Sequence, residues 1–196
     1  MVDAQTNENY PDDVIKALAH HYREILQLLG EDVSREGLLK TPERAARAMY
    51  YCTRGYRQDA DKVINGAVFE ANNHEMVVVR NIEFYSLCEH HLLPFFGHVS
   101  VGYIPGKTIV GLSKIARIVD MFARRLQVQE RFCDELCAVL YEKLGAQGVM
   151  IECRASHLCM KMRGVAKQDS ITVTTASRGI FEVDSSLRSQ FFSALN

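Results

Sequence analysis

The residues with the clearest chemical potential lie within one apolar stretch, Phe84–Pro94. Cys88, Glu89, His90 and His91 place a thiol, a carboxylate and two imidazoles at consecutive positions. Titratable groups are costly to bury among apolar residues unless they have a partner. A divalent metal is such a partner, because thiolate and imidazole are ligands of the zinc type. Cys88 and His91 have a spacing common for two ligands on one turn, so we expect a further ligand from elsewhere in the chain.

A second group of the same character follows at His157 and Cys159. Residues two apart on an extended strand point to the same face, so one strand is predicted to present both side chains together. Cys88, His91 and Cys159 would leave one position of a tetrahedral zinc site open for water. That vacancy separates a catalytic zinc from a structural one. His90 and His157 remain as acid–base candidates beside the site.

These cysteines also have a structural interpretation. Cysteine is among the most buried residue types, so an isolated cysteine usually packs in a core. We assign that role to the cysteines without a histidine within three residues, namely Cys52, Cys133, Cys137 and Cys153. Histidine close to Cys88 and Cys159 favours metal binding for these two, but spacing alone does not separate a catalytic metal from a structural one.

The composition is that of an ordinary globular protein, with 47% of the 196 residues hydrophobic and 24% charged. The formal net charge of -1 argues against a general nucleic-acid binder, so any anion site must be a local patch. Six cysteines without a regular framework indicate a reducing compartment rather than a disulfide scaffold. The polar start predicts no signal peptide, and no apolar run reaches the length of a membrane span. We therefore expect a cytoplasmic protein with no membrane association.

The N-terminal part is predicted to be helical after a disordered start. Residues 1–10 are polar and without periodicity, which predicts disorder. Residues 11–66 form a predicted helical region with two helices. The first begins at Pro11, and the second has Thr41 as its N-cap and Pro42 in its first turn.

Residues 67–196 show a ββααββ pattern. A β-rich stretch over 76–85 and a strand over 99–104 are separated by Pro94 and Gly97, which we expect to interrupt the pairing. The two strands would form a hairpin with the first metal-type group in its connection. Two helices follow this hairpin and precede two more strands.

The helices and the later strands complete an α+β body. Ser113 is the predicted cap of the first helix, and the second runs from Gln129 to Leu144. The later strands are predicted over Val149–Met160, Ile171–Thr175 and Ile180–Phe181, and Asp184 or Ser185 starts a C-terminal helix. Four antiparallel strands with two helices on one face leave two open edges. Pairing with neighbouring subunits would close those edges, so the pattern predicts a homo-oligomer.

Basic residues gather at two places. Ser113, Lys114 and Arg117 lie at a predicted helix N-terminus, where Lys and Arg together with the backbone N–H groups suit a phosphate. Lys161 and Arg163 lie just past the third expected metal ligand. If that strand lies near the helix, the anion patch and the metal share a pocket. Solvated surface charge is the alternative, and for any single lysine it is the better interpretation.

The polar segment Gln127–Glu130 precedes an apolar helix. One interpretation is a simple helix start. The other is a place where a carboxylate accepts hydrogen bonds from the amide and amine donors of a heterocycle. The residues of this segment leave both interpretations open.

Four ordered motifs carry a resemblance to a known family. They are Cys-Glu-His-His at 88–91, Gly-Leu-Ser-Lys-Ile-Ala-Arg at 111–117, Gln-Val-Gln-Glu at 127–130 and His-Leu-Cys-Met-Lys-Met-Arg-Gly at 157–164. In these motifs the chain resembles GTP cyclohydrolase I, and Thr41–Arg44 matches the helical N-terminal part of that family. We find no substitution at a position where the family carries chemistry.

The resemblance implies a tunnelling fold, in which residues 67–196 are the catalytic domain. Subunits of this fold close into a barrel ring, and two stacked rings usually make a homodecamer with active sites at subunit interfaces. The implied substrate is GTP, and the implied products are formate and 7,8-dihydroneopterin triphosphate. This reaction is the first step of folate and tetrahydrobiopterin synthesis.

The resemblance also implies roles for the metal-type residues. Zinc (Zn2+) would be held by Cys88, His91 and Cys159 and would make hydroxide available for attack on the guanine carbon that leaves as formate. His157 would protonate the imidazole nitrogen of guanine. His90 would move protons as the ring opens and the ribose rearranges.

The remaining implied roles concern substrate binding. Glu130 would anchor the amide and amino donors of guanine and discriminate against adenine. Gln129, next to it, is counted with the substrate-binding residues. The triphosphate and ribose would be held by the basic groups and their serine neighbour, which are Ser113, Lys114, Arg117, Arg163 and, as a weaker candidate, Lys161.

Two competing hypotheses remain. The chain could be a non-enzyme whose zinc is structural and has four protein ligands. It could also be another tunnelling-fold enzyme acting on a pterin or a deazaguanine, such as a nitrile reductase. Against the latter, such an enzyme needs a cysteine nucleophile without the second Cys–His cluster found here.

Overall fold

The computed structural model describes residues 10–64, 66–71 and 75–196. The chain divides into two compact units, one ending at Thr53 and the other running from Arg54 to Asn196. The predicted disordered segment 1–10 lies outside the described residues, with the exception of Tyr10.

The first unit is built on two helices that pack against each other. α1 (Asp12–Leu28) carries two aspartates in its first turn, where a carboxylate is favoured by the helix dipole. α2 (Thr41–Cys52) has Pro42 in its first turn as predicted, but its N-cap is Lys40 rather than Thr41. Thr41 is already inside the helix, because the N–H of Arg44 donates to the carbonyl oxygen of Lys40 at 3.1 Å, and the Thr41 hydroxyl donates to the carbonyl oxygen of Gly37 at 3.2 Å.

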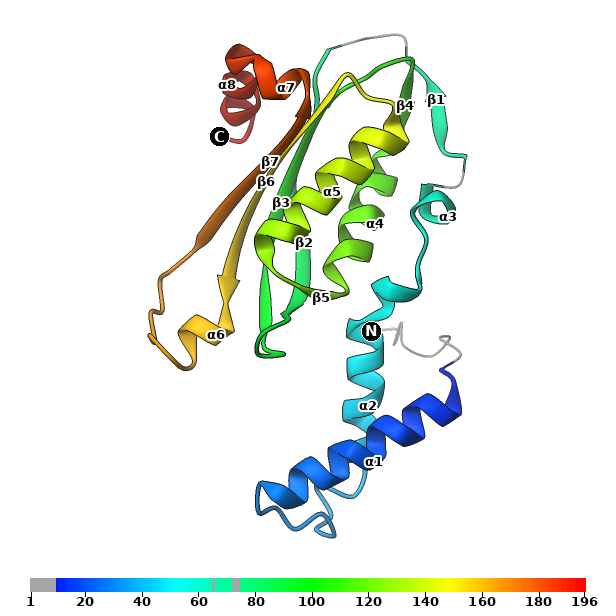
Figure 1. The fold of residues 1–196 in the computed structure, drawn as a ribbon, viewed down its shortest axis with the longest axis vertical. Coiled ribbons are helices and arrows are strands. Elements are labelled where there is room, and N and C mark those ends of the chain that lie inside the picture. The colour runs from blue at the N-terminus through cyan, green and yellow to red at the C-terminus, as the bar shows by residue number, and fades with distance from the viewer. Residues whose placement is uncertain (1–9, 65, 72–74) are drawn as a thin grey trace. The chain divides into compact units, whose positions relative to one another are not determined.

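The second unit confirms the predicted α+β class and has a five-stranded sheet at its centre (Figure 1). Its helical elements are η1 (Arg54–Arg57), α3 (Ala60–Ile64), α4 (Leu112–Ala123), α5 (Gln129–Leu144), α6 (Leu158–Lys161), α7 (Ile180–Val183) and α8 (Ser185–Ala194). Its strands are β1 (Val68–Glu70), β2 (Val77–Cys88), β3 (Pro94–Ile104), β4 (Thr108–Val110), β5 (Leu126–Gln127), β6 (Gly148–His157) and β7 (Thr172–Gly179).

The sheet order is β5-β2-β3-β6-β7, and its four long strands are antiparallel as predicted. β2 and β3 form the expected hairpin, with the first metal-type group at its connection. The prediction missed β5, which pairs in parallel with the end of β2 through Cys88 and Gln127. It also missed β1 and β4, which pair with each other. These strands have two or three residues each, too few for a pattern of alternation to show.

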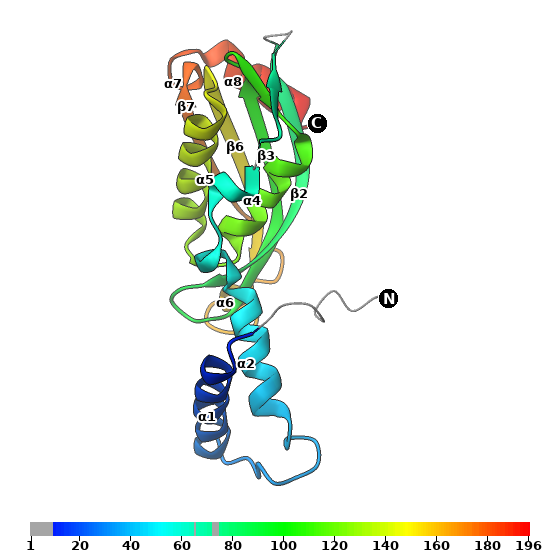
Figure 2. The same ribbon diagram turned by 90° about the vertical axis from the view of Figure 1, so that its right-hand side faces the viewer.

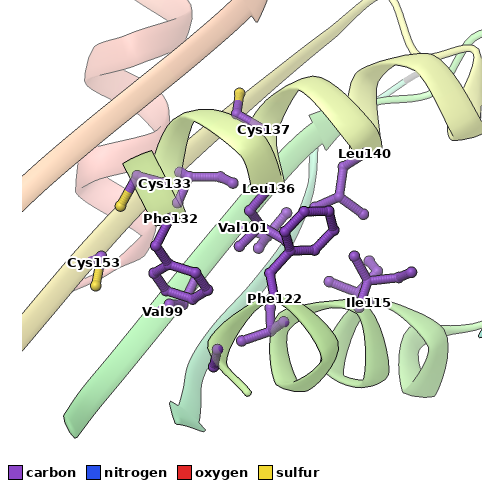
Figure 3. Close-up of a cluster of buried hydrophobic side chains, with 14 of the residues drawn as sticks. Val99, Val101, Ile115, Phe122, Phe132, Cys133, Leu136, Cys137, Leu140 and Cys153 are labelled. Carbon is purple, nitrogen blue, oxygen red and sulfur yellow. The ribbon is translucent and has the colours of Figure 1, made fainter. Parts of the chain in front are cut away.

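α4 and α5 lie across one face of the sheet, as Figures 1 and 2 show. Alternate residues of β3 face these helices, so that Val99, Val101 and Tyr103 are buried in the main core. Figure 3 shows Phe122 of α4 and Leu136 of α5 in this cluster. The two predicted helices therefore cover the same face and hold the sheet by apolar packing.

The other face of the sheet is covered at one end by α8. Phe191 of this helix lies directly over Gly102 of β3, where an added Cβ would come within 2.5 Å of the ring. α8 begins as predicted, because the side chain of Asp184 accepts hydrogen bonds from the N–H groups of Ser186 and Leu187.

Two predictions made from single residues are wrong, namely the interruption at Gly97 and the helix cap at Ser113. β3 starts at Pro94 and continues through Gly97. Glycine is required inside this strand because a Cβ there would lie 1.9 Å from the carbonyl oxygen of Arg154 in β6. α4 starts earlier than predicted, with Gly111 as its N-cap, so Ser113 is not the cap.

Both later strands end sooner than predicted. β6 stops at His157, which pairs with Phe95 at the start of β3, because no partner strand continues beyond that point. Cys159 consequently lies on the short helix α6. Ile180 begins α7 rather than a strand, since Gly179 adopts a φ of 66° and turns the chain out of the sheet.

Within the described residues, no helix combines the length and the apolar character needed to cross a membrane.

Candidate active site

The three expected metal ligands lie together at one end of the sheet. One ligand atom from each of Cys88, His91 and Cys159 lies within 4.8 Å of the others. Cys88 is the buried last residue of β2, His91 is exposed in the connection to β3, and Cys159 is half-buried on α6. Residues far apart in the sequence thus form one sulfur–nitrogen group.

A tight turn after β2 brings His91 close to Cys88. The N–H groups of His91 and Leu92 both donate to the carbonyl oxygen of Cys88, at 3.3 and 2.8 Å. Leu92 adopts a left-handed φ of 54°, which closes the turn. Nδ1 of His91 then lies 3.8 Å from Sγ of Cys88.

Cys159 reaches this group from a helix and not from a strand. The prediction that His157 and Cys159 share a strand face is therefore wrong, because the chain has already turned into α6. Burial and the nearby Cys88 sulfur raise the pKa of the Cys159 thiol. A divalent cation would remove the repulsion between two thiolates, and the donor set of two sulfurs and one imidazole suits zinc.

His90 lies beside the same group. Its Nδ1 is 3.9 Å from Sγ of Cys88, and its Nε2 is 3.8 Å from the carboxylate of Glu89. The ring is otherwise exposed. An imidazole in this position can exchange protons both with solvent and with a molecule bound at the sulfur–nitrogen group.

His157, the last residue of β6, is held on two sides. Its ring stacks on Phe95, with centroids 4.7 Å apart and planes 2° apart. Its Nε2 lies 2.7 Å from Oε1 of Gln129. The pKa of His157 is lowered by burial, and the negative charge of Glu130 offsets only part of this fall. The neutral imidazole is therefore favoured near pH 7.

Gln129 and Glu130, both predicted to contact substrate, point in different directions. Glu130 is exposed at the first turn of α5. Gln129 is only 1% exposed. Its amide nitrogen lies 3.1 Å from each of three acceptors, the carbonyl oxygens of Cys153 and Thr172 and the hydroxyl of Thr174. Of the two side chains, Glu130 is the one exposed to a ligand.

Arg131 is a site residue that sequence reasoning missed. Its guanidinium pairs with Glu89 and donates to Oε1 of Gln127 at 3.1 Å and to the carbonyl of Leu126 at 3.0 Å. The bond from Arg131 lowers the pKa of Glu89. Glu89 therefore links the turn that carries His91 to the start of α5. The only signal in the sequence was that the polar segment ending at Glu130 continues for one more residue.

A cavity of about 570 Å³ contains the first basic group. Lys114 and Arg117 line it from α4, and Nζ of Lys114 donates to the carbonyl of Val63 at 3.0 Å. η1 and α3 supply further basic residues to which sequence reasoning gave no role. The charged lining comprises Arg54, Arg57, Lys62, Lys114 and Arg117 against Asp59 and Asp120. The excess of positive charge suits a polyanion.

The second basic group lies elsewhere in the chain. The positive charge of Arg163 partly opposes the rise in the pKa of the Cys159 thiol, so Arg163 belongs to the surroundings of the sulfur–nitrogen group. Lys161 is the last residue of α6 and lies two residues before Arg163 in the sequence. Neither residue lines the cavity on α4, and the exposed Ser113 does not line it either. The expectation that both basic groups share a pocket does not hold within one chain.

The fold and the donor set together define an α+β protein with a place for a thiophilic divalent metal. Residues 18–196 match the family model of GTP cyclohydrolase I. The chain belongs to that family, and the resemblance drawn from the four motifs is confirmed.

Relatives in the family cover most of this chain. It is 53% identical over 179 residues to GTP cyclohydrolase 1 2 of Pseudomonas aeruginosa, which covers 91% of this chain and 99% of that protein. It is 52% identical over 172 residues to GTP cyclohydrolase 1 of Campylobacter jejuni subsp. jejuni, covering 88% of this chain and 90% of that protein. At this identity over nearly the whole length, the chain is an enzyme of the family.

Among solved structures, the archaeosine synthase QueF-Like in the apo form aligns with 55% of this chain and 97% of that chain. The sequence identity is 16% and the TM-score is 0.45, a likeness that supports no inference about function.

Proposed function

We propose that this chain is a zinc-dependent GTP cyclohydrolase. It opens the imidazole ring of the guanine in GTP by hydrolysis, releases formate and forms 7,8-dihydroneopterin triphosphate, which leads to folate or tetrahydrobiopterin. Family membership supports the nucleotide substrate. The observation that carries the proposal is the convergence of Cys88, His91 and Cys159, with His157 two residues from the last of them.

Zinc is the metal that the donor set fits best. Two thiolates and one imidazole are zinc-type ligands, and three protein ligands are the number found at catalytic rather than structural zinc sites. When bound, zinc lowers the pKa of water toward neutrality, which makes hydroxide available near pH 7.

The two histidines handle the protons. His157 is half-buried and held between Phe95 and Gln129, so its ring is ready in one orientation. We assign to it the delivery of a proton to an imidazole nitrogen of guanine, which makes the ring carbon a better electrophile. His90 is exposed and exchanges protons with solvent in the later steps.

Glu130 selects the nucleobase of the substrate. Its carboxylate lies at the exposed start of α5, close enough to His157 for its charge to act on that ring. A carboxylate accepts the two hydrogen bonds that the amide and amino groups of guanine donate. Adenine lacks this donor pair and would leave the carboxylate unpaired, so it is rejected.

The triphosphate is bound by both basic groups, which come from different chains. Lys114 and Arg117, with Ser113 beside them, supply one group, and Arg163 with Lys161 supplies the other. The cavity on α4 contains no residue of the second group, so a substrate that contacts both lies between neighbouring protomers.

The active enzyme is therefore a homo-oligomer. The sheet has β7 at one edge and the two-residue β5 at the other, and pairing of these edges with neighbours would close a barrel ring. We propose the decamer of two stacked rings. In this assembly residues 67–196 form the catalytic domain, and the helical region 11–66 adds the cavity residues of η1 and α3. We propose a cytoplasmic location, which the need for reduced thiol ligands supports.

The decisive experiment measures metal content, GTP turnover and formate release on the same purified protein. We expect about one zinc per protomer, formate released in step with GTP consumption, and loss of turnover with a chelator that returns when zinc is added. His157→Ala should keep the zinc and lose turnover, whereas His20→Ala, on the exposed face of α1, should keep both. Full activity of His157→Ala, or a zinc with four protein ligands by X-ray absorption, would refute the proposal.

A further inference from the structure

The side chain of Gln129 bonds to His157 at the point where α5 begins and β6 ends. We infer that Gln129 is a positioning residue that fixes which nitrogen of His157 carries the ring proton, so that Nδ1 is the nitrogen that faces the reaction. The catalytic consequence of this inference rests on the proposed function. The hydrogen-bonding state of His157 is independent of the proposed function.

The amide of Gln129 has only one orientation that satisfies its neighbours. Two of the three atoms at 3.1 Å from its nitrogen are backbone carbonyl oxygens, of Cys153 and Thr172. A carbonyl oxygen accepts and never donates, so the NH₂ end must point toward these strands. Oε1 therefore faces Nε2 of His157, at 2.7 Å.

This orientation determines the tautomer of His157. An amide oxygen is an acceptor only, so Nε2 of His157 must carry the hydrogen of this bond. In the neutral ring Nδ1 is then unprotonated, and in the charged ring Nδ1 holds the proton that can leave without breaking the bond to Gln129. Among the described residues, Nδ1 has no hydrogen-bond partner, so it is the nitrogen available to a ligand.

The rest of the ring is held as firmly. Phe95 is fully buried, and His157 pairs with it across β3 and β6, so the stacked ring cannot tilt without disturbing the sheet. A half-turn of the ring about its Cβ–Cγ bond would bring a C–H group against Oε1 of Gln129 and lose the hydrogen bond. Stacking sets the plane of the ring, and Gln129 sets its direction within that plane.

The support for Gln129 lies in the core. The hydroxyl of Thr174, one of its three acceptors, is also 3.0 Å from Sγ of Cys133. Figure 3 shows Cys133 on the first turns of α5 and Cys153 below it on the strand, both with their sulfurs in the buried cluster. Gln129 is thus anchored to a buried carbonyl of β6 and to half-buried groups of β7, and a rearrangement of its amide would leave these groups unpaired.

The test reads the tautomer directly. Full-length, metal-loaded protein is labelled with ¹⁵N-histidine, and the His157 signals are assigned by their loss in His157→Ala. We expect a protonated-type Nε2 and an unprotonated-type Nδ1 in the wild-type spectrum at neutral pH. We expect a mixture of both tautomers in Gln129→Leu, which has no acceptor oxygen opposite Nε2. Gln147→Leu is the matched control, since its amide donates to the carbonyl of Pro105 at the far end of β6.

Turnover gives the second readout. Loss of correctly placed general acid catalysis should lower kcat of Gln129→Leu by roughly 100-fold while KM for GTP changes only a few-fold. An unchanged kcat in Gln129→Leu, or a rise in KM alone, would overturn the inference. A neutral His157 ring with its proton on Nδ1 and an unprotonated Nε2 in the wild-type spectrum would overturn it even if the variants failed to fold. If the wild type shows the expected tautomer but does not consume GTP, the proposed function fails and the role of Gln129 in holding the ring stands.

Discussion

Replacing Gly97 with alanine tests whether the close approach of β3 and β6 holds His157 in place. The alanine Cβ would lie 1.9 Å from the carbonyl oxygen of Arg154 and 2.8 Å from Cα of Ala155. Both obstacles are backbone atoms of β6, so no side-chain rotation relieves the clash. The two strands must separate, and His157 lies at the end of the strand that moves.

The magnitude follows from this geometry. Since a Cβ contact below 3.0 Å essentially never occurs, β6 must shift by about 1 Å. Overpacking of this kind costs about 1–3 kcal/mol, and each ladder hydrogen bond that is lost adds about 1 kcal/mol. A misplacement of 1 Å at a reacting group lowers the rate by about 100-fold.

Thermal unfolding and GTP turnover, measured on the same preparations, check this prediction. Gly97→Ala should melt at a lower temperature than the wild type and lose turnover on the order of 100-fold. Gly37→Ala is the matched control, because the nearest atom to its new Cβ is the end of the flexible Arg35 side chain, at 3.1 Å. The control should stay within about 0.5 kcal/mol of the wild type. If Gly97→Ala melts and turns over like the wild type, the strands have room that the structure does not contain, and the reasoning is wrong.

Three further predictions concern the metal, the anion cavity and a buried thiol. Cys159→Ser should lose metal affinity by more than the roughly 10–100-fold that removal of an outer-shell partner costs, and metal analysis after gel filtration checks this; retained zinc would exclude Cys159 as a ligand. Lys114→Ala should raise KM for GTP about 10–100-fold with a smaller change in kcat, because a hydrogen bond to a charged group contributes about 1.5–3 kcal/mol; an unchanged KM would remove the cavity from the substrate site. Burial raises the pKa of Cys137 to about 12, so the stability it contributes is complete below the ordinary thiol pKa and is lost as the pH rises toward about 12. Melting temperatures above pH 9 should therefore fall less steeply in Cys137→Ala than in the wild type, and equal slopes would contradict the assignment.

The elements that the sequence predicted well are those whose signals are local. The bounds of α5 were predicted without error because an apolar stripe runs up to a glycine, and Gly145 does end the helix with a φ of 53°. The start of α8 was predicted from Asp184, whose side chain makes the expected capping bonds. In the same way, the types of side chain at Cys88 and Cys159 were enough to indicate a metal.

The errors of prediction come from contacts between distant segments. Gly97 suggested a break, yet it lies within β3 because the backbone of β6 passes too close for any side chain. Cys159 was expected on a strand, but β6 ends where β3 offers no more pairing, and the chain turns into α6. Arg131 and the basic residues of η1 had no local signal at all, because their partners are distant in the sequence.

The amino-acid sequence by itself determined the donor types, the ββααββ order and the family, because ligand chemistry, periodicity and motif order are properties of the chain. Only the tertiary structure decided that the thiol of Cys159 meets Cys88, that Gln129 points into the core toward His157, and that the two basic groups lie apart in one protomer. The physical reason is that a side chain's hydrogen bonds and burial depend on which strands and helices pack against it. That packing is set by the whole core and not by neighbours in the sequence.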